Sequence, residues 1–225
     1  HQTAVVSAVP DNSLGRGAVS AIRSHGVDCK SVQMRDGRMG LYFLAQGAGL
    51  RASEIVYDRA GSSFAQMAAA DFDWDALLVG ARMLHLSGIT PALGPQSAEA
   101  ALAAARAASR LGVPISFDGN YRAMLWESWD SDPRAILGEL IGLTDILFGN
   151  HRDISLVLGK DFSGDGSDRR REAAQAACAP PSCAWRLIVW NNLGACRWST
   201  TSIKAKAASR RSIRTKPLVE ASSAV

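Results

Sequence analysis

The sequence predicts a doubly wound α/β fold: a mostly parallel sheet covered by helices on both faces, with a small pair of β-strands projecting from it. After residue 60, short apolar runs alternate with helical segments at the spacing that parallel strands and crossover helices require. Before that, two strand-like runs flank a glycine-rich turn and stand outside the alternation. The 225 residues, 47% hydrophobic and 20% charged, are typical of a globular chain with a sizeable core.

The first elements follow from local signals. Residues 3–9 are apolar and rich in β-branched side chains, which predicts a strand. Turn and capping residues at 10–13 then start a helix that runs through Ser24 and ends at Gly26. A short strand is predicted over residues 31–35.

The later elements alternate in type. The projecting pair is predicted over residues 39–45 and 53–58, within a lid of about 39–59. The alanine-rich helix carries its polar residues on one face, which suits a helix lying on a sheet. Helices are predicted over 63–70, 97–111, 133–143, 153–158 and 168–177, and strands over 81–86, 113–117, 145–148 and 187–190.

Charge divides the chain into two parts. Residues 178–225 hold eight Lys/Arg and one acid, whereas residues 1–177 carry a net charge of −3. The basic tail also holds three of the four cysteines and three of the six tryptophans. Translation out of frame produces such a break, so our hypothesis is a frameshifted or poorly folded tail after a domain over 1–177. Basic tails can bind nucleic acid, but this one lacks regularly interleaved aromatics, and we expect no nucleic-acid partner.

Cysteine spacing and hydropathy indicate the cellular setting. Cys178, Cys183 and Cys196 are five and thirteen residues apart, which does not match a metal-binding pattern. No apolar run is long enough to span a bilayer, and the first residues lack the basic start of a signal peptide. We therefore expect reduced thiols, no membrane partner and a cytoplasmic protein.

Ligands of open parallel sheets bind beyond the carboxyl ends of the strands, so the residues that follow each strand are candidates. Asp118, Asn120 and Arg122 follow one strand and could grip a polyol, a carboxylate or a phosphate. The alternative is a turn cap and a surface ion pair. Asn150 and Asp153 follow the next strand and could organise Mg²⁺, or Asn150 could simply cap the next helix.

The projecting strands carry a second group of candidates. Tyr42 and Tyr57 on paired strands can cover a sugar, and Arg59 beside them can meet an anion. The alternative is a small packed cluster, which is the usual setting of tyrosine. His85 lies in an apolar strand and is expected to be a core histidine.

Several motifs keep their order and spacing over residues 3–177. Together they resemble the 2-keto-3-deoxygluconate kinases of the PfkB (ribokinase-like) carbohydrate kinase family. The motifs are PDNSLG, GRMGLYFLAQGAG, ASEIVYDRAGSSFA, HLSGITPALG, ISFDGNYRAMLW and DILFGNHRDISLVLG.

This resemblance implies a ribokinase-like fold with a β lid, and ATP- and Mg²⁺-dependent phosphorylation of 2-keto-3-deoxygluconate to its 6-phosphate. It assigns residues position by position. Asp153 stands where the family has a glutamate, so the carboxylate is one methylene shorter. The implied roles are substrate contact for Tyr42, Tyr57, Arg59 and Arg122, ATP contact for Asn120, Tyr121, Arg122 and Asn150, and indirect Mg²⁺ organisation for Asp153.

Two family motifs are not found. The Gly-Gly substrate loop would precede the first strand, and no Gly-x-Gly-Asp segment, which supplies the catalytic base, follows residue 177. We therefore expect a partial kinase domain with no assigned catalytic residue, which would be inactive by itself. The alternatives are a non-catalytic sugar-binding or partner-binding fragment and a PfkB kinase for another sugar. An exposed lid edge could also form a homo-oligomer.

Overall fold

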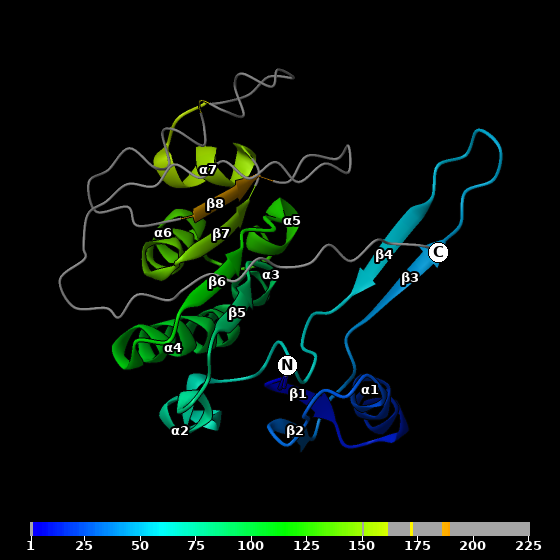
Figure 1. Cartoon of the computed structure of the whole chain (residues 1–225). Coiled ribbons are helices and arrows are strands. Elements are labelled where there is room, and N and C mark those ends of the chain that lie inside the picture. Colours follow the sequence, from blue (N-terminus) through cyan, green and yellow to red (C-terminus); the bar gives the residue numbers. More distant parts are fainter. Residues whose placement is uncertain (1, 150, 162–171, 173–185, 190–225) are drawn as a thin grey trace.

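The computed structural model describes residues 2–149, 151–161, 172 and 186–189, and it places three sheets in this part of the chain. Two parallel strands form an N-terminal unit, two antiparallel strands form a hairpin, and four parallel strands form the main sheet. Figure 1 shows the hairpin projecting away from the helices and the main sheet. The predicted α/β fold with a small β lid is confirmed.

The N-terminal unit consists of β1 (Ser7–Pro10), α1 (Ser13–Ser24) and β2 (Val32–Arg35). The strands run parallel, and Ser7 is in register with Val32. Asn12 caps the helix, because its side chain accepts hydrogen bonds from the backbone N–H groups of Leu14 and Gly15. Strand β1 begins at Ser7 and not at residue 3 as predicted, because the segment before Ser7 makes only an isolated bridge.

The hairpin pairs β3 (Leu41–Ala45) with β4 (Glu54–Asp58) in antiparallel register, with Tyr42 opposite Tyr57. Every residue of these strands except Asp58 is exposed. The Gly-rich segment between two β-runs therefore predicted the hairpin correctly.

The main sheet holds four parallel strands in sequential order: β5 (Leu84–Ser87), β6 (Ile115–Asp118), β7 (Ile146–Gly149) and β8 (Arg186–Val189). Its helices are α4 (Pro95–Leu111), α6 (Pro133–Leu143) and α7 (His151–Leu158). These agree with the predicted alternation. The last strand extends the sheet into the region after residue 177, whose other residues from 178 on lie outside the described part of the chain.

The principal core lies between one face of the main sheet and the helices α4 and α6. Ile115, Phe117 and Leu147 on this face are almost fully buried, as are Leu137 and Leu140 of α6. A smaller cluster joins Ala8 of β1 to Met67 and to Ala100 of α4. The alanine-rich helix therefore packs against both the N-terminal unit and the main sheet.

The helix predicted over residues 63–70 is wrong. This segment forms turns followed by a short 3₁₀ helix, η1 (Ala69–Asp71). Polar side chains take the backbone donors that a helix would use: Ser62 Oγ accepts from the Ala65 N–H, and Asp71 accepts from the Ala68 N–H. Asp71 also pairs with Arg35 at 2.7 Å, which fixes the segment against β2.

Three short helices were not predicted, and one predicted helix cannot be compared. The helix over 168–177 lies outside the described residues, apart from residue 172. No helix within the described ranges is both long enough and apolar enough to cross a bilayer. The additional helices are α2 (Trp74–Leu78), α3 (Ile89–Ala92) and α5 (Ala123–Trp126).

Two glycines of α1 provide a matched test of how this helix packs. A Cβ at Gly15 would lie 1.9 Å from the Pro10 carbonyl oxygen, whereas a Cβ at Gly17 would meet nothing within 4 Å. We expect Gly17→Ala to raise the free energy of unfolding by about 0.5–1 kcal/mol, since alanine favours helix. Gly15→Ala should lower it. Urea denaturation of both variants checks this, and equal shifts would show that α1 does not pack as described.

Candidate active site at the carboxyl ends of the parallel strands

The turns that follow β5, β6 and β7 are joined directly by backbone hydrogen bonds. The Gly88 N–H donates to the Asp118 carbonyl at 2.7 Å, and the Gly119 N–H donates to the Phe148 carbonyl at 2.8 Å. A Cβ at Gly88 would lie 1.9 Å from the carbonyl oxygen of Gly119. The strand ends therefore meet at one edge of the sheet, where the sequence predicted a ligand site.

The loop after β6 carries the predicted anion-binding residues. Asn120 adopts a left-handed backbone conformation, with φ of 41°, and its side-chain amide donates to Ser87 Oγ at 3.3 Å. Arg122 is exposed, and its guanidinium donates to the Tyr121 carbonyl. Tyr121 packs against the principal core, and this burial raises the pKa of its hydroxyl, with Glu127 adding to the effect. The loop presents an amide and a guanidinium, which suit an anion.

Asp153 approaches this loop from α7. Its side chain is only 3% exposed, and Oδ1 accepts a hydrogen bond from the Tyr121 N–H at 3.3 Å. The structure therefore places Asp153 beside Asn120, Tyr121 and Arg122, while Asn150 lies outside the described residues. The predicted indirect role of Asp153 at Mg²⁺ stays a prediction.

Asp118 ends β6 on the sheet face opposite the principal core. Burial raises the pKa of its carboxyl group, and the charges of His85 and Arg122 partly oppose this. His85 is exposed, and its Nδ1 lies within hydrogen-bonding distance of Ser116 Oγ, at 3.1 Å. The prediction of a core histidine is wrong, because the alternation of β5 turns His85 and Ser87 away from Leu84 and Leu86.

The same alternation could have identified Ser87, which the sequence analysis passed over. In a strand that reads Leu-His-Leu-Ser, the two polar residues share one face. Ser87 is also in register with Asp118, so a polar strip crosses β5 and β6 and ends at the loop.

The hairpin gathers the other predicted site residues. The rings of Tyr42 and Tyr57 have centroids 6.5 Å apart, and they are 60% and 54% exposed. The Arg59 guanidinium lies 4.6 Å from the Tyr57 ring centroid, in cation–π contact. Arg38 pairs with Asp58 at the end of the hairpin. Such exposed rings do not form the packed cluster that was the alternative interpretation.

The two groups of residues stand apart. Figure 1 shows the hairpin separated from the carboxyl ends of the main sheet. Tyr42 and Tyr57 lie on β3 and β4, Arg59 directly follows β4, and the described loop residues follow β6. The predicted substrate residues are thus divided, with Tyr42, Tyr57 and Arg59 at the hairpin and Arg122 in the loop after β6, and their roles stay predictions.

The described residues suit an anion better than a bare metal ion. No group of three or more His, Cys, Asp or Glu side chains within the described ranges is placed to hold a metal. The Asp153 carboxylate is buried against the loop, so it does not fit as a direct ligand of Mg²⁺ in this arrangement. Exposed Arg122 and half-buried Asn120 do fit a phosphate.

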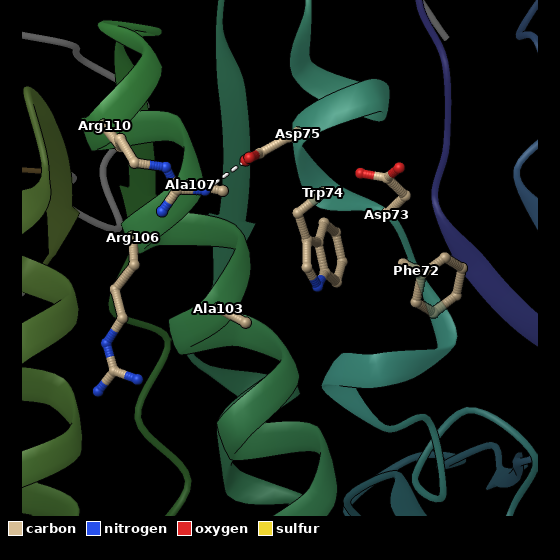
Figure 2. A pocket seen from close by; sticks show the side chains of 8 residues that line it. All are labelled: Phe72, Asp73, Trp74, Asp75, Ala103, Arg106, Ala107 and Arg110. Atoms are coloured by element: carbon tan, nitrogen blue, oxygen red, sulfur yellow. Dashed lines mark hydrogen bonds and ion pairs between the residues drawn. The ribbon is translucent and has the colours of Figure 1, made fainter.

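A groove of about 360 Å³ lies elsewhere, between α2 and α4 (Figure 2). Arg110 pairs with Asp75 across it, and Arg106 pairs with Glu99 and Glu139. The pairs with Asp75 and Glu139 link α4 to α2 and α6, whereas Glu99 lies within α4 itself, so we explain the groove by the packing of these helices. Its lining residues are Phe72, Asp73, Trp74, Asp75, Ala103, Arg106, Ala107 and Arg110.

The fold and the strand-end loop define a ribokinase-like α/β protein. The chain belongs to the pfkB family of carbohydrate kinases, whose sequence profile matches residues 1–187. It is 33% identical over 169 residues to a 2-dehydro-3-deoxygalactonokinase of Haloferax volcanii, covering 75% of this chain and 52% of the relative. A 2-dehydro-3-deoxygluconokinase of Thermoproteus tenax is 31% identical over 157 residues, covering 69% and 47%. The chain thus spans about half the length of these curated relatives.

Solved structures give the same family. A 2-dehydro-3-deoxygluconokinase of Thermotoga maritima superposes with a TM-score of 0.72 and 34% identity, covering 83% of this chain and 56% of that one. A more distant neighbour from E. coli, with 18% identity and a TM-score of 0.68, shares the fold over 84% of this chain and 56% of that one. It was solved in complex with ATP and Mg²⁺.

The burial of Asp118 predicts a pH effect. The pKa of the Asp118 carboxyl is raised above 3.8 in the folded chain, so the protonated carboxyl favours the folded state. As the pH rises from about 4 through the folded pKa, Asp118 loses its proton and the folded chain loses this stability. Asp118→Asn stays neutral, so it should gain stability relative to the parent between about pH 3 and pH 7. Urea denaturation across this range measures the difference. A constant difference would contradict the assignment.

Proposed function

We propose that the whole protein phosphorylates 2-keto-3-deoxygluconate at its 6-hydroxyl, with ATP as donor and Mg²⁺ as the accompanying cation. The observation that carries the proposal is the cluster at the hairpin, in which half-buried Arg59 lies beside the exposed rings of Tyr42 and Tyr57. Two rings with hydroxyl groups and a cation suit a sugar that carries a carboxylate. Membership of the carbohydrate kinase family and the acid-sugar kinases among the relatives support this substrate class.

The candidate residues fall into two sets, one for the sugar and one for the phosphates of ATP. Tyr42 and Tyr57 would cover the sugar and Arg59 would meet its carboxylate. Arg122, on the separate loop, would contact the same substrate once the hairpin closes over the strand ends. Asn120, Tyr121, Arg122 and Asn150 would border the ATP phosphates. Bound Mg²⁺ would neutralise phosphate charge, and a lid excludes the water that would otherwise hydrolyse ATP.

The substrate charge can be tested on the hairpin. Arg59→Ala should weaken binding of 2-keto-3-deoxygluconate about tenfold or more, since a charge-assisted contact is lost, and should leave binding of uncharged fructose unchanged. Arg51→Ala removes an equal charge near the hairpin tip, where Arg51 donates to the Gln46 carbonyl, and serves as the matched control. Calorimetric titration measures both. Equal losses for the two sugars, or for the two variants, would count against an acid-sugar site.

Two alternative functions can be distinguished by measuring sugar binding and phosphate transfer. A non-catalytic sugar-binding or partner-binding chain would bind the sugar acid but show no phosphate transfer, which is the behaviour we expect of these 225 residues because no catalytic base is assigned. A pfkB kinase for another sugar would prefer a different substrate. Relatives described as 5-dehydro-2-deoxygluconokinases, 28% identical, point to one such sugar.

We also propose that the hairpin mediates a homodimer in the cytoplasm. The face opposite the tyrosines exposes Leu41, Phe43 and Val56, and a lone two-stranded hairpin is marginally stable in water. A second hairpin could cover the apolar centre of this face, which lies between Glu54 and Asp58, and pair with an open edge.

The dimer has a direct test. Phe43→Asp should convert the protein to a monomer, since it places a charge in the covered face. Leu50→Asp at the hairpin tip is the control, because Leu50 is fully exposed. Sedimentation equilibrium gives the mass of each variant. A parent chain that sediments as a monomer at all concentrations would refute this interface.

A further inference from the structure

We infer that Asp153 is a positioning residue: its buried carboxylate braces the loop of residues 119–122, and so sets where Asn120 and Arg122 meet an anion. We call this contact the brace. It consists of a hydrogen bond that Asp153 accepts from the Tyr121 N–H, and of the close approach of the Asp153 side chain to Gly119, which leaves no room for a Cβ there. The identity of the anion as a nucleotide phosphate rests on the proposed function.

The first argument is the burial of the carboxylate. Asp153 is 3% exposed, in the first turn of α7, and a carboxylate is withdrawn from water only where polar groups of the protein compensate. Its Oδ1 accepts from the Tyr121 N–H at 3.3 Å. The helix N-terminus adds a favourable dipole. The side chain is therefore directed at the loop.

The second argument is the space at Gly119. A Cβ there would lie 2.9 Å from Asp153 Oδ2, 3.0 Å from its Cγ and 3.1 Å from its Cβ. Gly119 is absent from the glycines with positive φ, so its backbone conformation does not itself require glycine. Glycine is required at position 119 because the Asp153 carboxylate occupies the space that a side chain there would need.

The third argument is the conformation that the brace supports. Asn120 is the only non-glycine residue with positive φ in the described part of the chain. Such a conformation persists where the surroundings enforce it. The Gly119 N–H bond to Phe148 holds one side, Ser87 holds the Asn120 side chain, and Asp153 holds Tyr121. Three elements thus converge on one short loop.

The brace differs in its consequences from a role as Mg²⁺ ligand. A brace acts on the loop whether or not a metal is present, whereas a ligand acts only with the metal. A brace also couples Asp153 to Gly119, because each occupies space that the other would need.

Unfolding of the 225-residue chain tests this coupling through four proteins: the parent, Gly119→Ala, Asp153→Ala and the double variant. Gly119→Ala should lower the Tm of the parent by several degrees, and the same substitution should cost little once Asp153 is alanine. Gly138→Ala in α6 is the control, because a Cβ there meets nothing within 4 Å, and its effect should be the same in both backgrounds. Additive effects of Gly119→Ala and Asp153→Ala would overturn the inference.

Binding of ADP, measured by calorimetry with Mg²⁺ and again with EDTA, provides the second readout. Asp153→Ala should weaken binding at least tenfold and equally in both conditions, while Asp153→Asn, which keeps an acceptor oxygen and the shape, should stay within about threefold of the parent. A loss seen only with Mg²⁺ would identify a metal ligand and overturn the brace. If the parent does not bind ADP, that result counts against a nucleotide role of this loop in the 225-residue chain, and the unfolding measurements alone decide the brace.

Discussion

The close contact of the turns after β5 and β6 is the constraint on which the site depends. Gly88 and Gly119 meet where a single Cβ would collide with backbone, and the Gly88 N–H spans the junction to the Asp118 carbonyl. This contact requires parallel strands in register, so that both strands end at the same level. The principal core under Phe117 maintains that register. The placement of the polar loop is thus a consequence of packing on the other face of the sheet.

Much of this arrangement could be predicted from sequence, because it depends on local patterns. Alternating apolar runs and helices predicted the main sheet, and the capping residues at 10–13 predicted the start of α1, where Asn12 is the cap. The rule that ligands bind beyond strand ends predicted the loop at Asn120 and Arg122. The hairpin followed from its glycine-rich turn.

The failures have non-local causes. Residues 63–70 carry apolar residues that suit a helix, but Arg35, distant in sequence, draws Asp71 into an ion pair. The burial of Asp153 depends on the approach of α7 to Gly119, which no pattern within either segment reveals. The apolar neighbours of His85 in the sequence favoured a buried position, but the alternation of the strand places it on the exposed face that it shares with Ser87.

The alanine-rich surface of α4 has a mechanical consequence. Its buried positions are almost all alanine, and Ala100 belongs to the small cluster that also holds Met67 and Ala8 of β1. Methyl groups interlock far less than long side chains, so such an interface resists small sliding displacements weakly. The N-terminal unit leads directly into the hairpin (Figure 1). Sliding of the N-terminal unit along this smooth helix face would therefore carry the attached hairpin with it.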